Sequence, residues 1–470
     1  MSTRSFCIHG HFYQPPREDP VTGEIPKEPG ASPYNNWNEK IEAECYRPNS
    51  ELGNFSQISF NIGPTLWDWL EHFNPDVCQQ IVKQDRSNVD RYGVGNAMAQ
   101  AYHHTILPLA SLQDKITQIT WGIADFEARF QRKPTGMWLP ETAVDLETLA
   151  VLADQGIEFT ILAPWQSDVD HIDTTEPYYV ALPQGKRIAI FFYHQELSTQ
   201  VSFSPSSTSN ADQFAIHEIL PRFQVGKKPQ EEPQMLLIAS DGELYGHHQP
   251  FRDRFLAHLV NGAAVHAGLT TTFPALWLKD HPPRKWVNIR DRTSWSCSHG
   301  VMRWIGQCEC ISSDGRWKYY LRRAFDRLSA SLDELYEKAL TPYIADPWGL
   351  RNDYIHVILG QAKASDIINQ KAGRRLPEEA VRCIHLLLES QRERQRIYTS
   401  CGWYFDDFNR IEPKNNVAYA AQAVRLACMA TGVDFSSQVI SDLKHVISHR
   451  SGLRGDLVYQ RQLQRWSEGD

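Results

Sequence analysis

The chain has few cysteines, no long apolar stretch and no excess of basic residues. Nine cysteines spread over 470 residues do not form the dense pattern of a disulfide framework, so we expect reduced thiols and a cytoplasmic location. No apolar run is long enough to cross a bilayer, and no secretory signal is evident at the N-terminus. We therefore expect no membrane partner.

The charge balance argues against nucleic acid as a partner. The formal net charge is −8, and lysine and arginine are scattered along the chain, which excludes the basic stripe typical of nucleic-acid binding. An apolar fraction of 41% without low-complexity tracts is typical of a globular protein with a large core. The length favours two domains.

The first 290 residues show the pattern of an α/β protein. No glycine-rich nucleotide-binding motif follows any apolar run, so no cofactor is expected. Seven short apolar runs, with helical patterns such as residues 145–154 between them, favour parallel strands and a barrel. These runs are residues 6–9, 58–62, 136–139, 159–162, 188–193, 235–239 and 270–278.

After about residue 310 the apolar period changes from that of strands to that of helices. One helical stripe carries Leu321, Phe325, Leu328, Leu332 and Leu335, and similar patterns recur over residues 381–388 and 417–429. The predicted organisation is therefore a barrel domain over residues 1–290 and a helical domain over residues 291–470.

The first apolar run leads into the motif HGHFYQPP, residues 9–16. Active sites of parallel barrels lie at the carboxyl ends of the strands, and His9 and His11 share one face of a strand. They are candidates for binding sugar hydroxyls or, alternatively, a metal ion. Gln14 joins them as a candidate substrate-binding residue.

Two further strand ends carry carboxyl groups. Glu141 follows Trp138 and Pro140 in a setting that suits a nucleophile or proton donor, although it could instead cap the next helix. If Asp241 ends its strand, its side chain lies in the same barrel mouth, and glycoside cleavage needs such a pair. The alternative is that Asp241 or Glu243 pairs with an arginine and shapes a loop.

The remaining candidates accompany these motifs. Additional candidate substrate-binding residues are Tyr102, His104, Trp138, Glu243, Tyr245, His247, Trp295 and His299. Cys297, His299, Cys308 and Cys310 could be arranged as a zinc site, but the paired C-x-x-C spacing is absent. Buried thiols are the preferred interpretation, and no metal is expected.

Five motifs occur in order along the chain: HGHFYQPP, GMWLPETAVD, SDGELYGHH, SWSCSHG and CGWYFDD. Together they resemble glycoside hydrolase family 57, and in particular its subgroup with the domain of unknown function 3536. The resemblance implies a (β/α)7 barrel, a distorted TIM-like barrel, followed by an α-helical C-terminal domain. It also implies retaining action on an α-linked oligo- or polysaccharide by an amylase, 4-α-glucanotransferase, branching enzyme or α-galactosidase.

By its place in the motif, Glu141 resembles the family's nucleophile and Asp241 its general acid/base. The chain departs from the family pattern at two points: Tyr13 precedes Gln14, and no glutamate lies between Gly95 and Gln100. Two other functions stay open. One is a metal-dependent hydrolase or deacetylase with His9, His11 and Asp241 as ligands, and the other is a glycan-binding protein without activity.

Overall fold

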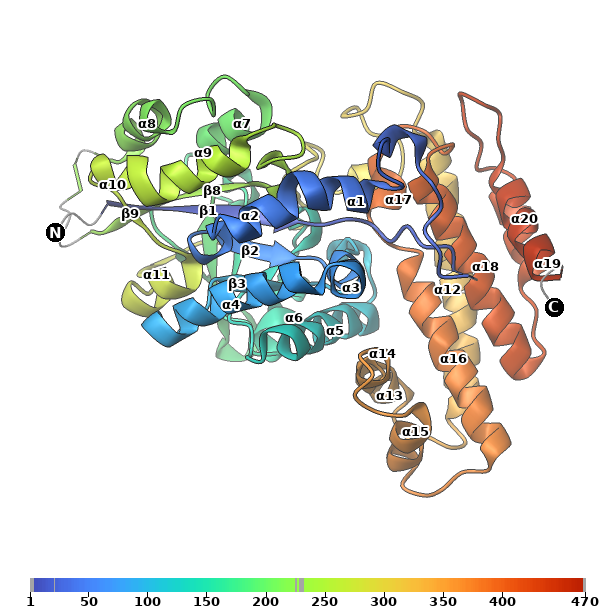
Figure 1. The fold of residues 1–470 in the computed structure, drawn as a ribbon. Coiled ribbons are helices and arrows are strands. Elements are labelled where there is room, and N and C mark those ends of the chain that lie inside the picture. The colour runs from blue at the N-terminus through green and yellow to red at the C-terminus, as the bar shows by residue number, and fades with distance from the viewer. Residues whose placement is uncertain (1–3, 21, 225, 228–231, 468–470) are drawn as a thin grey trace. The chain divides into compact units, whose positions relative to one another are not determined.

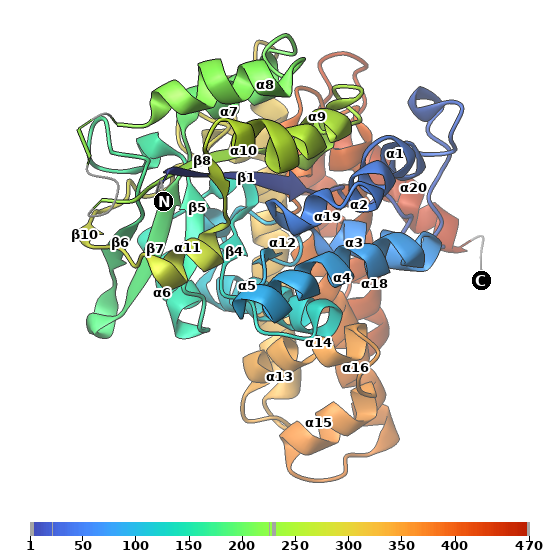
Figure 2. The same ribbon diagram turned by 60° about the vertical axis from the view of Figure 1, so that its left-hand side comes forward.

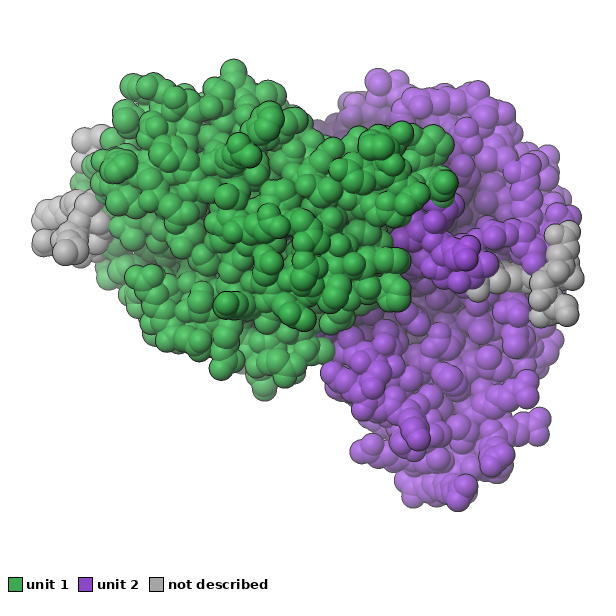
Figure 3. All heavy atoms as spheres, in the orientation of Figure 1, with its two compact units in different colours: residues 1–16, 27–101, 126–295 green, residues 17–26, 102–125, 296–470 purple. Residues whose placement is uncertain are grey.

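The computed structural model describes residues 4–20, 22–224, 226–227 and 232–467. Figure 3 colours the two compact units into which the chain divides. The first takes the described residues up to 16, residues 27–101 and residues 126–295. The second takes residues 17–26, 102–125 and the described residues from 296 on, so two segments of the N-terminal half belong to it.

Seven parallel strands form the barrel of the first unit. They are β1 (Arg4–Phe12), β2 (Ser59–Ile62), β3 (Ala97–Gln100), β4 (Met137–Trp138), β5 (Phe159–Leu162), β7 (Arg187–Phe192) and β8 (Gln234–Asp241). The order β4-β3-β2-β1-β8 makes one sheet, and β5 pairs with β7 in another. A bridge between Gly136 and Phe159 joins β4 to β5, and the His194 N–H donates to the Leu237 carbonyl at 2.7 Å beside β8. These contacts close the ring.

Three short strands lie outside the ring. They are β6 (Tyr178–Ala181), antiparallel to β7, β9 (Thr270–Thr271), paired with β1, and β10 (Lys285–Trp286), paired with β6. Figure 1 shows β1 beside β8, with helices of the first unit around the strands. These helices are α1 (Trp37–Ile41), α2 (Arg47–Glu51), α3 (Pro64–Phe73), α4 (Pro75–Tyr92), α6 (Leu146–Asp154), α7 (Gln195–Phe203), α8 (Ala211–Gln213), α9 (Arg252–His258), α10 (Ala264–His266) and α11 (Pro274–Asp280).

The strand count of seven is right, but one member of the predicted set is wrong. Residues 270–278 form a strand only at Thr270–Thr271, because Pro274 begins helix α11 and the apolar side chains after it follow a helical period. The seventh barrel strand is instead β3, whose four residues are all buried. The four residues of β3 are two alanines, a methionine and a glutamine, so the segment lacks the β-branched and aromatic residues that are typical of strands.

The second unit is helical, as predicted. Its helices are α12 (Arg316–Leu340), α13 (Pro347–Asp353), α14 (Ile355–Ile358), α15 (Ala364–Ala372), α16 (Glu378–Arg396), α17 (Cys401–Tyr404), α18 (Ile411–Thr431), α19 (Ser436–Leu443) and α20 (Gly455–Ser467). Helix α5 (Leu112–Phe130) is divided between the units after Asp125. Figures 1 and 2 show α12, α16 and α18 side by side.

The long helices pack through the apolar stripes seen in the sequence. Leu321, Phe325, Leu328 and Leu332 of α12 are buried. Among the described residues, no helix is both long enough and apolar enough to span a bilayer.

A substitution at Gly136 tests how closely β4 and β5 pack where the barrel closes. A Cβ at this position would lie 2.3 Å from a ring carbon of Phe159, so Gly136→Ala forces the ring or the bridge to move. We expect it to lower the free energy of unfolding by about 1–3 kcal/mol in urea denaturation. Gly226→Ala is the control, because its Cβ would meet nothing within 4 Å. Equal stabilities of the two variants would contradict this account of the closure.

Candidate functional site

The carboxyl ends of β1 and β8 lie side by side. His11 is level with Asp241 in the parallel register, and His9 is level with Ala239. Residues level with one another in neighbouring strands point to the same face, so His9, His11 and Asp241 share one face of the sheet. Asp241 is the last residue of β8, as predicted.

That face is the barrel interior. The ring of Trp138, on β4, stacks on His9 at 4.6 Å and on His11 at 5.1 Å between ring centroids. Because β2 and β3 lie between β1 and β4 in the sheet, these contacts cross the barrel. Trp138 is fully buried.

The two histidines are held by a polar network on β2 and β3. The rings contact Ser59 Oγ (2.9 Å from His9 Nδ1) and Asn61 Oδ1 (3.2 Å from both His9 Nε2 and His11 Nδ1), and Asn61 Nδ2 donates to Gln100 at 2.7 Å. Burial lowers the pKa of His9 to about 3 and of His11 to about 4. Both imidazoles are therefore neutral at physiological pH.

Glu141 lies in a strained turn after β4. Its backbone has φ 57° and ψ 20°, and Thr142 follows at φ 48°, the left-handed region that few residues with a side chain adopt. The Trp295 Nε1–H donates to Glu141 Oε2 at 3.1 Å, and the Trp295 backbone N–H donates to the Glu141 carbonyl at 3.0 Å. Glu141 does not cap α6, because the side chain of Asp145 accepts from Thr148 N at 2.8 Å.

Trp295 connects Glu141 to the stacked rings. Its ring meets Trp138 edge-on at 5.1 Å and His11 at 6.3 Å. A continuous series of contacts thus runs from Asp241 beside His11, through Trp138 and Trp295, to Glu141. The structure brings together the two carboxyl groups that the sequence singled out.

Among the carboxyl groups of this site with a shifted pKa, that of Asp241 is shifted furthest. Burial, followed by the charges of Glu243 and Glu141, raises its pKa to about 8. Solvent still reaches the side chain. Asp241 is thus a carboxyl surrounded by protein but open to water, and it is protonated at neutral pH. Among the described residues, neither Asp241 nor Glu243 pairs with an arginine, so the arginine pairing of the alternative is wrong.

Glu243 is bonded inside the protein. Its Oε1 accepts from the Tyr46 hydroxyl at 2.6 Å and from the Tyr13 N–H at 3.1 Å, and Gln14 also hydrogen-bonds to the carboxyl group. Burial raises the pKa of Glu243 to about 7 against these hydrogen bonds. Glu243 and Gln14 are both buried, where they connect β1, the Tyr46 segment and the end of β8.

Tyr245 and His247 follow in the same loop. Tyr245 is 1% exposed, and its hydroxyl accepts from Ser240 Oγ at 3.3 Å. His247 Nδ1 lies 2.5 Å from Glu44 Oε2, in a pocket of about 420 Å³ that also includes Phe251 and Arg254.

Three predicted residues belong to the second unit. Tyr102 meets the ring of Trp121 at 5.5 Å, and His104 Nδ1 lies 2.6 Å from Ser400 Oγ. His299 lies among Cys297, Cys308 and Cys310. Substrate binding by these three residues stays a prediction.

Sequence reasoning missed Ser59, Asn61, Gln100 and Tyr46. Ser59 and Asn61 alternate with Phe60 and Ile62 in β2, and this two-residue period was a signal that one face of the strand is polar. Tyr46 lies in a helical segment far along the chain from Glu243, so no local pattern identifies it.

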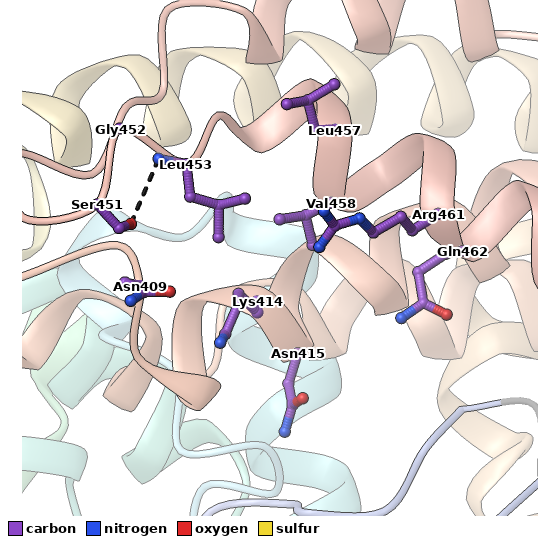
Figure 4. A pocket seen from close by; sticks show the side chains of 10 residues that line it. All are labelled: Asn409, Lys414, Asn415, Ser451, Gly452, Leu453, Leu457, Val458, Arg461 and Gln462. Atoms are coloured by element: carbon purple, nitrogen blue, oxygen red, sulfur yellow. Dashed lines mark hydrogen bonds between the residues drawn. The ribbon is translucent and has the colours of Figure 1, made fainter.

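A separate pocket of about 640 Å³ lies within the second unit (Figure 4). The side chains that line it include Lys414 and Arg461 but no carboxylate. Ser451 Oγ accepts there from the Leu453 N–H at 3.3 Å. The pocket therefore lacks the groups for acid/base chemistry of the kind that Glu141 and Asp241 offer.

The fold and the site define a barrel protein with two carboxyl groups at the carboxyl ends of its parallel strands. Residues 22–290, more than half of the chain, match glycosyl hydrolase family 57, and residues 314–466 match a domain of unknown function, DUF3536. The chain belongs to glycosyl hydrolase family 57, as its motifs predicted.

Similar proteins bear the names of α-glucan enzymes. The chain is 24% identical over 194 residues to alpha-amylase 1 of Dictyoglomus thermophilum, covering 40% of this chain and 26% of the relative. It is 25% identical over 174 residues to a 4-alpha-glucanotransferase of Thermococcus litoralis, covering 36% and 25%. The matches thus span about a quarter of each curated relative.

A solved structure confirms the fold. The exo-type maltose-forming amylase of Pyrococcus sp. ST04 superposes with a TM-score of 0.76 over 98% of this chain and 88% of that one, at 14% identity. The predicted (β/α)7 barrel with a helical C-terminal region is confirmed.

The raised pKa of Asp241 predicts a particular dependence of stability on pH. Its carboxyl is protonated up to about pH 8 in the folded state but only to about pH 4 when unfolded, so its contribution to stability falls as pH rises between these values. Asp241→Asn removes this contribution. We expect the melting temperature of Asp241→Asn to equal that of the wild type below about pH 4. As the pH rises to about 8, the variant should become increasingly more stable than the wild type.

The control is Asp170→Asn, since Asp170 is 88% exposed and paired with Arg290. Scanning calorimetry at a series of pH values measures both variants. A difference between Asp241→Asn and wild type that stays constant over the window would show that the pKa of Asp241 is not raised.

Proposed function

We propose that the protein is a retaining glycoside hydrolase or 4-α-glucanotransferase that acts on α-linked glucans. Family membership and the names of the similar proteins support a glycosidic activity. The observation that carries the proposal is that Asp241, at the end of β8, lies near enough to Glu141 for the charge of Glu141 to contribute to its raised pKa of about 8.

In the first step, a Glu141 carboxylate oxygen attacks the anomeric carbon as the glycosidic bond breaks, and Asp241 gives its proton to the leaving oxygen. A proton donor must hold its proton at the working pH, and burial of Asp241 beside two carboxyl groups meets this condition. The products of the step are a glycosyl ester on Glu141 and the shortened glucan.

In the second step, Asp241 must act as a base. Esterification removes the negative charge of Glu141, and because that charge raises the pKa of Asp241, its loss lowers this pKa. Asp241 can then take a proton from water or from a sugar hydroxyl, which attacks the anomeric carbon and releases Glu141. Two displacements at one carbon retain its configuration.

The surrounding residues have positioning roles in this scheme. Trp295 holds the Glu141 carboxylate through its Nε1–H, and the strained turn fixes the direction of the side chain. His9, Gln14, Glu243 and Tyr245 are buried, so we assign them to support of the site. His11 and Trp138 are buried as well and belong to the same support, so the partly exposed Trp295 provides the ring surface beside Glu141.

The metal-dependent alternative has weaker support. Asn61 contacts both His9 and His11, and their rings stack on Trp138. Within the described part of the chain, His9, His11 and Asp241 are not among the residues whose ligand atoms converge on a possible metal position. We therefore propose that the glycosidic step itself needs no metal.

Rescue by azide separates the two carboxyl roles. We expect Glu141→Ala and Asp241→Ala each to lower kcat for an activated α-glucosyl substrate by at least about a hundredfold. Azide should restore turnover in both variants, giving the β-glucosyl azide with Glu141→Ala and the α-glucosyl azide with Asp241→Ala, because only the latter still passes through a glycosyl ester. Product configuration is read by NMR.

Glu243→Gln serves as the matched control. Glu243 is only two residues from Asp241, but its carboxyl group is hydrogen-bonded to Tyr46 and to the Tyr13 backbone. Azide should not restore any activity that this change removes. If the two variants gave azides of the opposite configurations, Asp241 would be the nucleophile and Glu141 the general acid/base. If the wild type bound maltooligosaccharides without turnover, the glycan-binding alternative would be favoured.

A further inference from the structure

A loop in the second unit gathers three cysteines and a histidine that the glycosidic site does not use. Between residue 296 and the start of α12 at Arg316, the chain forms only one short 3-10 helix, Met302–Trp304. Irregular segments of this length are uncommon in compact domains and need interactions that order them. Cys297, His299, Cys308 and Cys310 all lie in this loop.

Their ligand atoms converge. Cys297 Sγ lies 3.5 Å from Cys308 Sγ and 3.8 Å from Cys310 Sγ, and His299 Nδ1 lies 3.4 Å from the sulfur atoms of both Cys308 and Cys310. All four atoms lie within 4.8 Å of one another. Cys297 and Cys308 are almost completely buried.

Four of the six separations are close to the edges of a metal tetrahedron, and the other two are within 4.8 Å. With Zn–S bonds of about 2.3 Å and Zn–N bonds of about 2.0–2.1 Å, a regular tetrahedron has S···S edges of about 3.8 Å and S···N edges of about 3.6 Å. The four distances above deviate from these edges by a few tenths of an ångström. We propose that Cys297, His299, Cys308 and Cys310 bind one zinc ion.

Disulfide formation explains the arrangement less well. The sulfur atoms are 3.5 Å and 3.8 Å apart, well beyond the bond length of about 2.05 Å, and all three cysteines are free. A disulfide would also leave the third thiol and His299 without a role. Packing of small apolar thiols explains the burial of Cys297 and Cys308, but it does not explain a histidine nitrogen in contact with Cys308 and Cys310.

The surroundings match the charge of such a site. Zinc with three thiolates and a neutral imidazole has a net charge of −1. Lys318, on the first turn of α12, is fully buried, and its Nζ has no hydrogen-bond partner among the described residues. Its charge interacts with Cys297 and Cys308, and also with Asp406 and Arg303. A negative metal centre supplies a counter-charge for this ammonium group.

The histidine also has the orientation of a metal ligand. Nδ1 faces the sulfur atoms, whereas Nε2 lies 3.7 Å from a carboxylate oxygen of Glu309. A carboxylate is one of the common partners of the second ring nitrogen of a zinc-bound histidine. Four protein ligands leave no open position, so the zinc is structural and orders the loop that leads into α12.

The test begins with the full chain, purified without a metal-affinity tag and dialysed against metal-free buffer. Elemental analysis by mass spectrometry should find one zinc per chain. Zinc removed with a chelator should be replaceable by Co²⁺, giving the absorption bands of tetrahedral cobalt bound to thiolates, and its removal should lower the melting temperature of the second unit.

His299→Ala and Cys310→Ser change solvent-exposed ligands and are therefore expected to fold. Each should lower the affinity for zinc by at least about tenfold. Cys428→Ser, in α18 outside the cluster, should retain the full zinc content. A metal-free wild type that gains no cobalt–thiolate bands, a disulfide within the cluster, or unchanged zinc content in both ligand variants would overturn the proposal.

Discussion

Repulsion among carboxyl groups at the end of β8 is the constraint around which the site is organised. Asp241 and Glu243 are two residues apart, and the charge of Glu141 also acts on Asp241. Burial raises the pKa of Asp241 to about 8, so the repulsion is relieved by a retained proton. Glu243 instead receives hydrogen bonds from Tyr46 and the Tyr13 backbone. The two neighbouring carboxyl groups thus have different environments.

The barrel makes this arrangement possible. Closure of the ring brings the ends of β1, β4 and β8 around one interior, where Trp138 stacks on His9 and His11. Neutral histidines add no charge to an interior that already holds carboxyl groups. Trp295 connects these rings to Glu141, and Cys297, the first of the four proposed zinc ligands, follows it by two residues.

Much of this organisation could be predicted from the sequence, because buried parallel strands are apolar runs and polar residues stand at their ends. Asp241 at the end of β8 and Glu141 shortly after β4 were placed in this way. The helix that begins at Pro274 was not predicted, because a short apolar run does not distinguish a strand from a helix. Contacts between distant segments, such as that of Tyr46 with Glu243, follow only from the fold. The cysteine cluster was visible, but its spacing lacked the usual C-x-x-C pairs.

The most direct test of the central claim is to trap the glycosyl ester. A 5-fluoro-α-glucosyl fluoride, which slows the second step, is incubated with wild type and with Glu141→Gln, and the labelled chain is analysed by intact and peptide mass spectrometry. The account predicts one fluoroglucosyl group on Glu141 of the wild type and none on the variant. Turnover with an inverted product, or a label on another residue, would contradict it.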